Sequence, residues 1–313
     1  MTTFALARRP SLSPRLFVGG AALAAVVTLW AAFALSTRAL ETAGLTTVDA
    51  ALARFAVPAL LLSPFLPRTV RALRTERPLV IALVLLAGLP HFLLFAEGAH
   101  LTSAALTGLL VPGTVPLFVA ILLFLREGTV IRGRRLLALL AVVAGVAASA
   151  LLTGGTADIG GICVLVTAGL VWALYTLGLA RTRLDPIGVI LIVSVTSTIA
   201  ALALATTGFL PSRILAGTAD LSGFGWYALV QGVGTGLLST ACYVIAVKNL
   251  GSSITATAGA LSPVLTAAVA VPLLHEPLTS GLAIAMALIA AGVAVFTLSP
   301  ATASDRPAAP KRE

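Results

Sequence analysis

Charge is scarce in this sequence. Only 10% of its 313 residues are charged, whereas 59% are hydrophobic. A soluble domain carries about 25% charged residues, so a water-soluble fold of this length is excluded. Disorder is excluded as well, because the chain has ample apolar surface to bury. The composition predicts an integral membrane protein whose main surroundings are the lipid bilayer.

Residues that support catalysis or metal binding are also few. The chain has 2 cysteines and 3 histidines, and Cys163 and Cys242 lie inside apolar runs without a metal-binding pattern. No His-Glu-x-x-His or Gly-x-Ser-x-Gly motif occurs, and no apolar run contains two carboxylates in its span. We therefore expect no enzyme, no catalytic residue, no metal and no cofactor. The net charge of +9 comes without a basic face with interleaved aromatics, so no nucleic-acid partner is expected.

Long apolar runs are what the sequence has in abundance. They are continuous rather than alternating, which excludes a β-barrel and predicts an all-α fold. The first run follows Arg8 and Arg9, yet it exceeds the about 7–15 residues of a signal peptide, so we interpret it as a retained helix. Two tails flank the runs, 1–15 and 299–313, and the second is rich in Pro, Ala and charge and is expected to be disordered. Ten transmembrane helices are predicted, at about 16–37, 48–66, 79–97, 101–125, 134–153, 160–180, 187–208, 224–247, 253–274 and 279–298.

The basic residues alternate with these runs. With the N-terminus placed in the cytoplasm, 17 of the 20 basic residues fall in cytoplasmic loops and tails. The outer loops hold only Arg38 and Arg213, and Arg54 lies within the second run. Because Lys and Arg collect on the cytoplasmic side, we expect a multi-pass protein of the cytoplasmic membrane with both termini inside.

The chain also repeats itself at about half its length. The first unit covers 16–153 and the second 160–298, with five predicted helices each. An odd number of helices places the second unit upside down relative to the first, which makes an inverted 5+5 repeat. The matched positions are an aromatic motif, a proline-containing segment, a glutamate and a Gly-Val pair: Trp30-Ala31-Ala32-Phe33 with Trp172-Ala173-Leu174-Tyr175, Ala105, Gly108 and Pro112 with Ala256, Gly259 and Pro263, Glu127 with Glu276, and Gly145-Val146 with Gly292-Val293.

These motifs resemble the drug/metabolite transporter superfamily, in its EamA-like ten-helix branch. The resemblance covers nearly the whole chain outside the tails and implies a secondary carrier of small metabolites, often an exporter. One departure is Arg126-Glu127-Gly128, where the family usually has a Gly-Glu pair. Further residues that carry the resemblance are Ala53-Arg54-Phe55, Thr102-Ser103-Ala104-Ala105, Ser252 to Gly259, Ser262-Pro263 and His275-Glu276-Pro277-Leu278-Thr279.

A central cavity between the two units is the expected binding site. Matched prolines in membrane helices indicate interruptions at a carrier's site, and deep aromatic rings can shape a pocket. The alternatives are helix packing for the prolines, a backbone-bonded ring for His91, and snorkelling or pairing with Asp49 or Glu41 for Arg54. Glu127 and Glu276 are expected to be structural, each at the start of the next helix. The predicted cavity residues are Trp30, Arg54, His91, Pro112, Trp172, Tyr175, Gln231, Tyr243 and Pro263.

The expected function is a secondary carrier that works by alternating access. Its substrate would be a small metabolite, such as an amino acid or a related compound, with export as the favoured direction. The alternatives are a drug or cation efflux carrier, a channel, and a membrane-embedded enzyme. The predicted cavity lacks a buried acidic residue, which argues against a dedicated multidrug-cation site and leaves His91 as the deep titratable group. We therefore expect a facilitator or exchanger, as a monomer or homodimer.

Overall fold

A computed structural model describes residues 14–40, 45–102, 104–152, 158–219, 224–274 and 280–299. The ordered elements in these ranges are all helices. Both expected tails, apart from residues 14, 15 and 299, lie outside the described residues, as does Glu276. The helices are α1 (Pro14–Leu40), α2 (Thr47–Leu61), η2 (Ser63–Phe65), α3 (Leu66–Leu73), α4 (Pro78–Leu85), α5 (Leu89–Leu101), α6 (Ala104–Glu127), α7 (Gly133–Leu152), α8 (Ile159–Leu179), α9 (Pro186–Thr206), α10 (Phe224–Tyr227), η3 (Ala228–Ser239), α11 (Thr240–Leu250), α12 (Ser252–Gly259), α13 (Ser262–Leu274) and α14 (Ser280–Leu298).

Several of these helices suit a membrane. Among the described residues, 6 helical segments are long and apolar enough to cross a bilayer. A seventh is obtained if α2 and the helix after it, which are bent by 59° at their junction, count as one span. The chain is therefore a multi-pass, all-helical membrane protein in the part that the structure describes. Each expected range coincides with helical structure, but length and composition qualify only these six or seven as spans.

Local sequence explains where several helices begin. At α2, Thr46 accepts a hydrogen bond from the Asp49 backbone, and the Asp49 carboxylate accepts one from Thr46 N. Asp158 caps α8, and Asp185 caps α9 by accepting from Gly188 N at 2.8 Å. Such side chains satisfy N–H groups that the first turn of a helix leaves free.

Three long apolar runs are interrupted rather than straight. The run at 79–97 divides into α4 and α5, where Leu89 N donates to Ser197 Oγ of α9 at 2.9 Å. A Cβ built at Gly88 would lie 2.1 Å from the same hydroxyl oxygen, so only glycine allows this close approach. The eighth run contains the wide π-helical segment η3, and the ninth divides between α12 and α13. Irregular turns of this kind concentrate at functional sites in membrane carriers.

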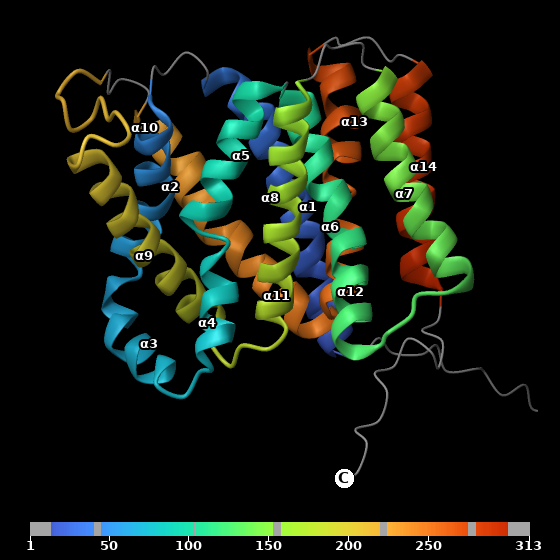
Figure 1. Cartoon of the computed structure of the whole chain (residues 1–313), viewed down its shortest axis with the longest axis horizontal. Helices are drawn as coiled ribbons and strands as arrows, with labels where there is room; N and C mark the ends of the chain where they lie inside the picture. Colours follow the sequence, from blue (N-terminus) through green and yellow to red (C-terminus); the bar gives the residue numbers. More distant parts are fainter. Residues whose placement is uncertain are drawn as a thin grey trace, which may run out of the picture.

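Figure 1 shows the helices side by side in one bundle, with α7 and α14 paired at one edge and α3 and α9 near the other. The connection from α6 to α7, the connection from α8 to α9, and α3 all lie at the same end of the bundle (Figure 1). The segment that follows α9 lies at the opposite end (Figure 1). These segments at the shared end, which we call the basic end, contain in their sequences Arg68, Arg71, Arg74, Arg126, Arg132, Arg181 and Arg183.

Candidate functional site

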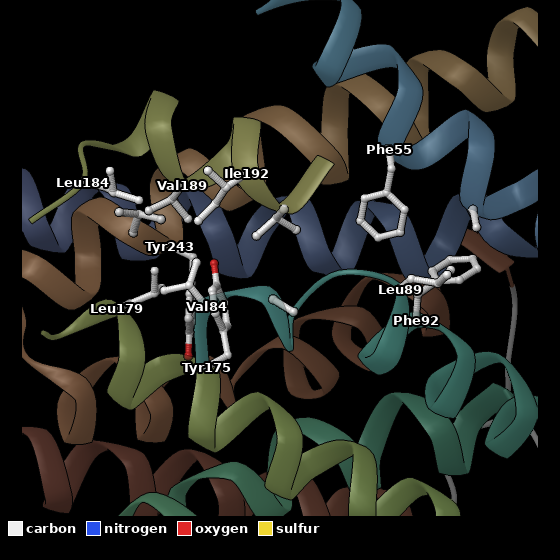
Figure 2. Packing of buried hydrophobic residues seen from close by; sticks show 14 of the residues in the cluster. Phe55, Val84, Leu89, Phe92, Tyr175, Leu179, Leu184, Val189, Ile192 and Tyr243 are labelled. Atoms are coloured by element: carbon white, nitrogen blue, oxygen red, sulfur yellow. The ribbon is translucent and has the colours of Figure 1, made fainter. Parts of the chain in front are cut away.

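Four aromatic rings from three helices form a central aromatic cluster. Trp30 of α1 lies 5.7 Å from Trp172 of α8 and 5.5 Å from Tyr243 of α11, measured between ring centroids. Tyr175 stacks on Tyr243 at 6.0 Å, and Figure 2 shows these two rings next to each other. Tyr175 and Tyr243 are almost completely buried, whereas both tryptophans are half-buried. The structure thus brings together four of the predicted cavity residues, and their rings contact one another directly.

The polar ends of this cluster are hydrogen-bonded. Trp30 Nε1 donates to Ser239 Oγ at 2.8 Å, which joins α1 to η3. The Tyr243 hydroxyl shares a hydrogen bond of 2.7 Å with Thr176 Oγ1, which joins α11 to α8. Buried polar groups are stable when they find such partners. These bonds hold the rings in defined orientations inside an otherwise apolar core.

His91 lies beside the cluster and differs from it. Its ring centroid is 4.7 Å from that of Trp172, and the residue is 7% exposed. Its Nε2 is buried without a hydrogen-bond partner. An unsatisfied buried polar atom costs about 1–3 kcal/mol, so its persistence calls for an explanation in function. His91 is the third residue of α5 and follows the interruption between α4 and α5.

Arg54 and Gln231 form a second part of the site, which we call the arginine pair. Arg54 Nη1 donates to Gln231 Oε1 at 3.4 Å, which links α2 to η3. The guanidinium carbon lies 5.8 Å from the ring centroid of Phe55 and 5.7 Å from that of Phe92. Figure 2 shows the two phenylalanines facing each other from α2 and α5. Phe92, which contacts Arg54, directly follows His91, which contacts Trp172. The arginine pair and the aromatic cluster are therefore neighbours.

Asp49, one expected partner of Arg54, has different partners. It is completely buried, and its carboxylate accepts from Ser212 Oγ at 2.5 Å and from Arg213 N at 3.0 Å. It therefore anchors the segment after α9 to the start of α2. Glu41, the other expected partner, lies outside the described residues.

The matched prolines occupy different settings. Pro112 is half-buried inside the continuous helix α6, which packs against α8. Pro263 is the second residue of α13, so it begins a helix after an interruption instead of bending one. This difference has a steric reason, because a proline fits the first turn of a helix without losing a hydrogen bond. Their role in lining a cavity remains a prediction.

Glu127 lies at the basic end. It is the last residue of α6, and its carboxylate accepts from Arg181 Nη2 at 2.5 Å. This ion pair joins α6 to the segment after α8. A second pair, Arg68 with Asp185 at 2.5 Å, joins α3 to the start of α9. Glu127 thus makes a structural contact with an arginine side chain at the end of α6, whereas the sequence predicted a role at the start of the next helix.

Three residues that support the site were not predicted from the sequence. Thr176, Ser197 and Phe92 hold Tyr243, the start of α5 and Arg54, respectively. Thr176 follows Trp172 by one helical turn, which was a usable signal. Ser197 and Phe92 lie in apolar runs whose neighbours the sequence alone does not reveal. Among the described residues, no group of three or more His, Cys, Asp or Glu side chains could hold a metal ion.

Comparison with known proteins agrees with this architecture. Residues 159–298 match the model of the EamA-like transporter family. A crystal structure of another protein superposes with a TM-score of 0.69 at 21% sequence identity, over 92% of this chain and 98% of that chain. No curated protein matches the sequence. The structural likeness shows the fold alone, whereas the family match over residues 159–298 confirms the resemblance to EamA-like transporters of the drug/metabolite type that was noted in the sequence.

Proposed function

We propose that the protein is a secondary carrier that moves a small metabolite, such as an amino acid or a related compound, across the cytoplasmic membrane by alternating access. Family membership supports a membrane transporter. The observation that carries the more specific proposal is the unpartnered His91 Nε2 beside a cluster built from both halves of the chain. A buried polar atom at this depth is explained if a substrate supplies its partner during transport.

Contacts between matched positions support the inverted 5+5 repeat of ten helices. Residues related by a two-fold axis contact each other only where both lie close to that axis. The matched Trp30 and Trp172 are in ring contact at 5.7 Å. The matched Gly145 and Gly292 both lie in the interface of α7 and α14, where a Cβ at either would lie within 3.0 Å of a backbone oxygen of the other helix. One matched pair in contact and a second matched pair that shares a single helix interface are expected if the axis passes close to both pairs.

The closed cluster suits one state of an alternating-access cycle. The four rings fill the space between their helices, so a substrate enters only after the two halves separate. The interruption before α5 and the wide turns of η3 give helices of both halves a place to bend. We propose export as the direction and exchange without an obligatory proton as the mode, because no carboxylate occupies the cluster in the described residues.

The test is counterflow in proteoliposomes that contain the purified protein, with the same pH on both sides. A panel of labelled amino acids and other small metabolites is exchanged against the unlabelled compounds. A carrier gives saturable counterflow, whereas a channel gives none, because counterflow needs a site that faces one side at a time.

Substitutions locate the site in the same assay. At substrate concentrations well below KM, Trp30→Ala, His91→Ala and Tyr243→Ala are expected to lower the exchange rate at least about tenfold, because a loss of about 1.4 kcal/mol of binding weakens the affinity tenfold. Trp226→Ala is the matched control, since this tryptophan is 57% exposed and makes none of the ring contacts of the cluster. Wild-type kinetics in all three cluster variants would move the site elsewhere.

A further inference from the structure

We propose that the site selects substrates with a net negative charge, and that Arg54 binds their carboxylate group. This inference rests on the proposed carrier function and defines its substrate class. Its basis is the charge of the described residues around Arg54, Gln231 and His91. Among the small metabolites of the proposed function, such a site prefers those with a net negative charge, whereas net-neutral zwitterionic amino acids and cations are not preferred.

Arg54 is a cation without a counterion in the described part of the chain. Its contacts are one long hydrogen bond of 3.4 Å to the neutral Gln231 amide and the rings of Phe55 and Phe92. Five N–H donors in a fork suit a carboxylate, which accepts two of them in parallel. A charge within a membrane span is costly, by about 2.5–3.5 kcal/mol on insertion scales. A substrate carboxylate relieves this cost because it pairs the charge.

The acidic residues nearest to this site are held away from it. Asp49, five residues earlier in α2, is held by Thr46, Ser212 and the backbone of Arg213. Glu97 of α5 is exposed. The fold therefore leaves the positive charge of Arg54 available, although it places a buried carboxylate in the same helix.

The neighbours of Arg54 add neutral polar groups of the right kind. Gln231 is 4% exposed, and its side-chain amide carries two N–H donors beside the accepting oxygen. His91 offers the unpartnered Nε2, which donates when the ring carries its proton there. The N-terminus of α5 begins two residues before His91, and the positive end of a helix dipole favours an anion.

The aromatic surroundings define the rest of the substrate. Phe92 contacts Arg54 on one side of α5, and Trp172 contacts His91 at 4.7 Å. An apolar or planar body attached to the carboxylate therefore meets ring faces and edges. A free ammonium group on the same body finds no carboxylate among these residues and is repelled by Arg54.

Binding of four matched compounds to the purified full-length protein tests the charge class. The compounds are phenylacetate, phenylacetamide, phenylethylamine and phenylalanine, which share a ring and differ in charge. Trp30 and Trp172 lie in the site, so quenching of tryptophan fluorescence reports binding. Phenylacetate is expected to bind at least about tenfold more tightly than the other three, the factor that hydrogen bonds to a charged group supply.

Three variants assign this preference to Arg54. Arg54→Gln should lower phenylacetate affinity at least about tenfold, and Arg54→Lys should restore part of it. Gln231→Glu leaves Arg54 in place but supplies an internal counterion, so it should also abolish phenylacetate binding while keeping the fold. Arg71→Gln is the matched control, because this exposed arginine donates only to the Pro67 carbonyl of its own helix.

The outcomes separate this inference from the carrier function. Stronger binding of the amine or the zwitterion overturns the anion site, as does absent phenylacetate binding or wild-type affinity in Gln231→Glu. Saturable counterflow of a cationic metabolite would keep the carrier and reject the anion site. Selective phenylacetate binding without counterflow of any compound would keep the anion site and reject the carrier.

Discussion

Single buried polar residues divide into those that stabilise the fold and those that lack partners. Asp49 represents the first group, with a completely buried carboxylate that accepts from the Ser212 hydroxyl and from the backbone N–H groups of residues 46, 213 and 214. His91 represents the second group, with its buried and unpartnered Nε2. A satisfied polar group supports stability, whereas an unsatisfied one reduces it and is tolerated where it is used.

Removal of the Asp49 carboxylate is expected to destabilise the protein. Asp49→Ala leaves the Ser212 hydroxyl and three backbone N–H groups without their acceptor, so we expect a loss of about 2–3 kcal/mol. Thermal unfolding of the purified protein in detergent measures the effect. Asp158→Ala is the control, because that exposed carboxylate accepts only from Gly160 N, and its loss should cost about 1 kcal/mol or less. Equal losses in both variants would contradict a special role for Asp49.

The residue types of the site were predictable, but their contacts were not. Large aromatics and a histidine deep in apolar runs indicated a pocket, and the structure places Trp30, Trp172, Tyr243 and His91 together. The partners that orient them are far apart in the sequence, such as Thr176 and Tyr243, which are separated by 67 positions. Hydrophobic periodicity reports which residues are buried and not which ones meet.

At the scale of helices, the apolar runs predicted position well and continuity poorly. Helix α8 was expected at 160–180 and spans Ile159–Leu179. The run at 48–66, in contrast, ends its first helix at Leu61 and bends by 59° into the next segment. Pro58, Pro64 and Pro67 favour such a bend, but neighbouring helices decide where it occurs.

The contact of α7 with α14 gives a prediction for a matched glycine. A Cβ at Gly292 would lie 2.6 Å from the Ala138 carbonyl oxygen, and a backbone atom cannot move aside without shifting a helix. We expect Gly292→Ala to lower the free energy of unfolding by about 1–3 kcal/mol, the cost of overpacking.

Gly108→Ala is the control for this substitution. It adds the same methyl group within α6, where nothing lies within 4 Å of the new Cβ. Because alanine is favoured over glycine in a helix by about 0.5–1 kcal/mol, this variant should be as stable as the wild type or more so. A lower melting temperature for Gly292→Ala together with an unchanged or higher one for Gly108→Ala supports close α7–α14 packing. A Gly292→Ala variant as stable as the wild type contradicts it.

At the scale of the whole molecule, the arginine distribution and the architecture agree. Segments rich in arginine, far apart in the sequence, lie at one end of the bundle (Figure 1). The ion pairs Arg68–Asp185 and Glu127–Arg181 tie three of these segments together. The rule that cytoplasmic loops collect Lys and Arg predicts that the basic end of the bundle faces the cytoplasm.

Reporter fusions test this orientation and the even number of spans. Pro211 follows α9 at the end of the bundle opposite to the basic end (Figure 1). A fusion at Pro211 should therefore be active for an extracytoplasmic reporter such as alkaline phosphatase, and a fusion at the C-terminus for a cytoplasmic one such as green fluorescent protein. A further fusion after Arg132, between α6 and α7, should agree with the C-terminal fusion, because Arg135 at the start of α7 donates to the carbonyl of Ser299, which follows α14, at 3.0 Å. If the Pro211 and C-terminal fusions report the same side, the number of spans between them is even. That result would contradict the inverted arrangement of two five-helix units, which requires an odd number.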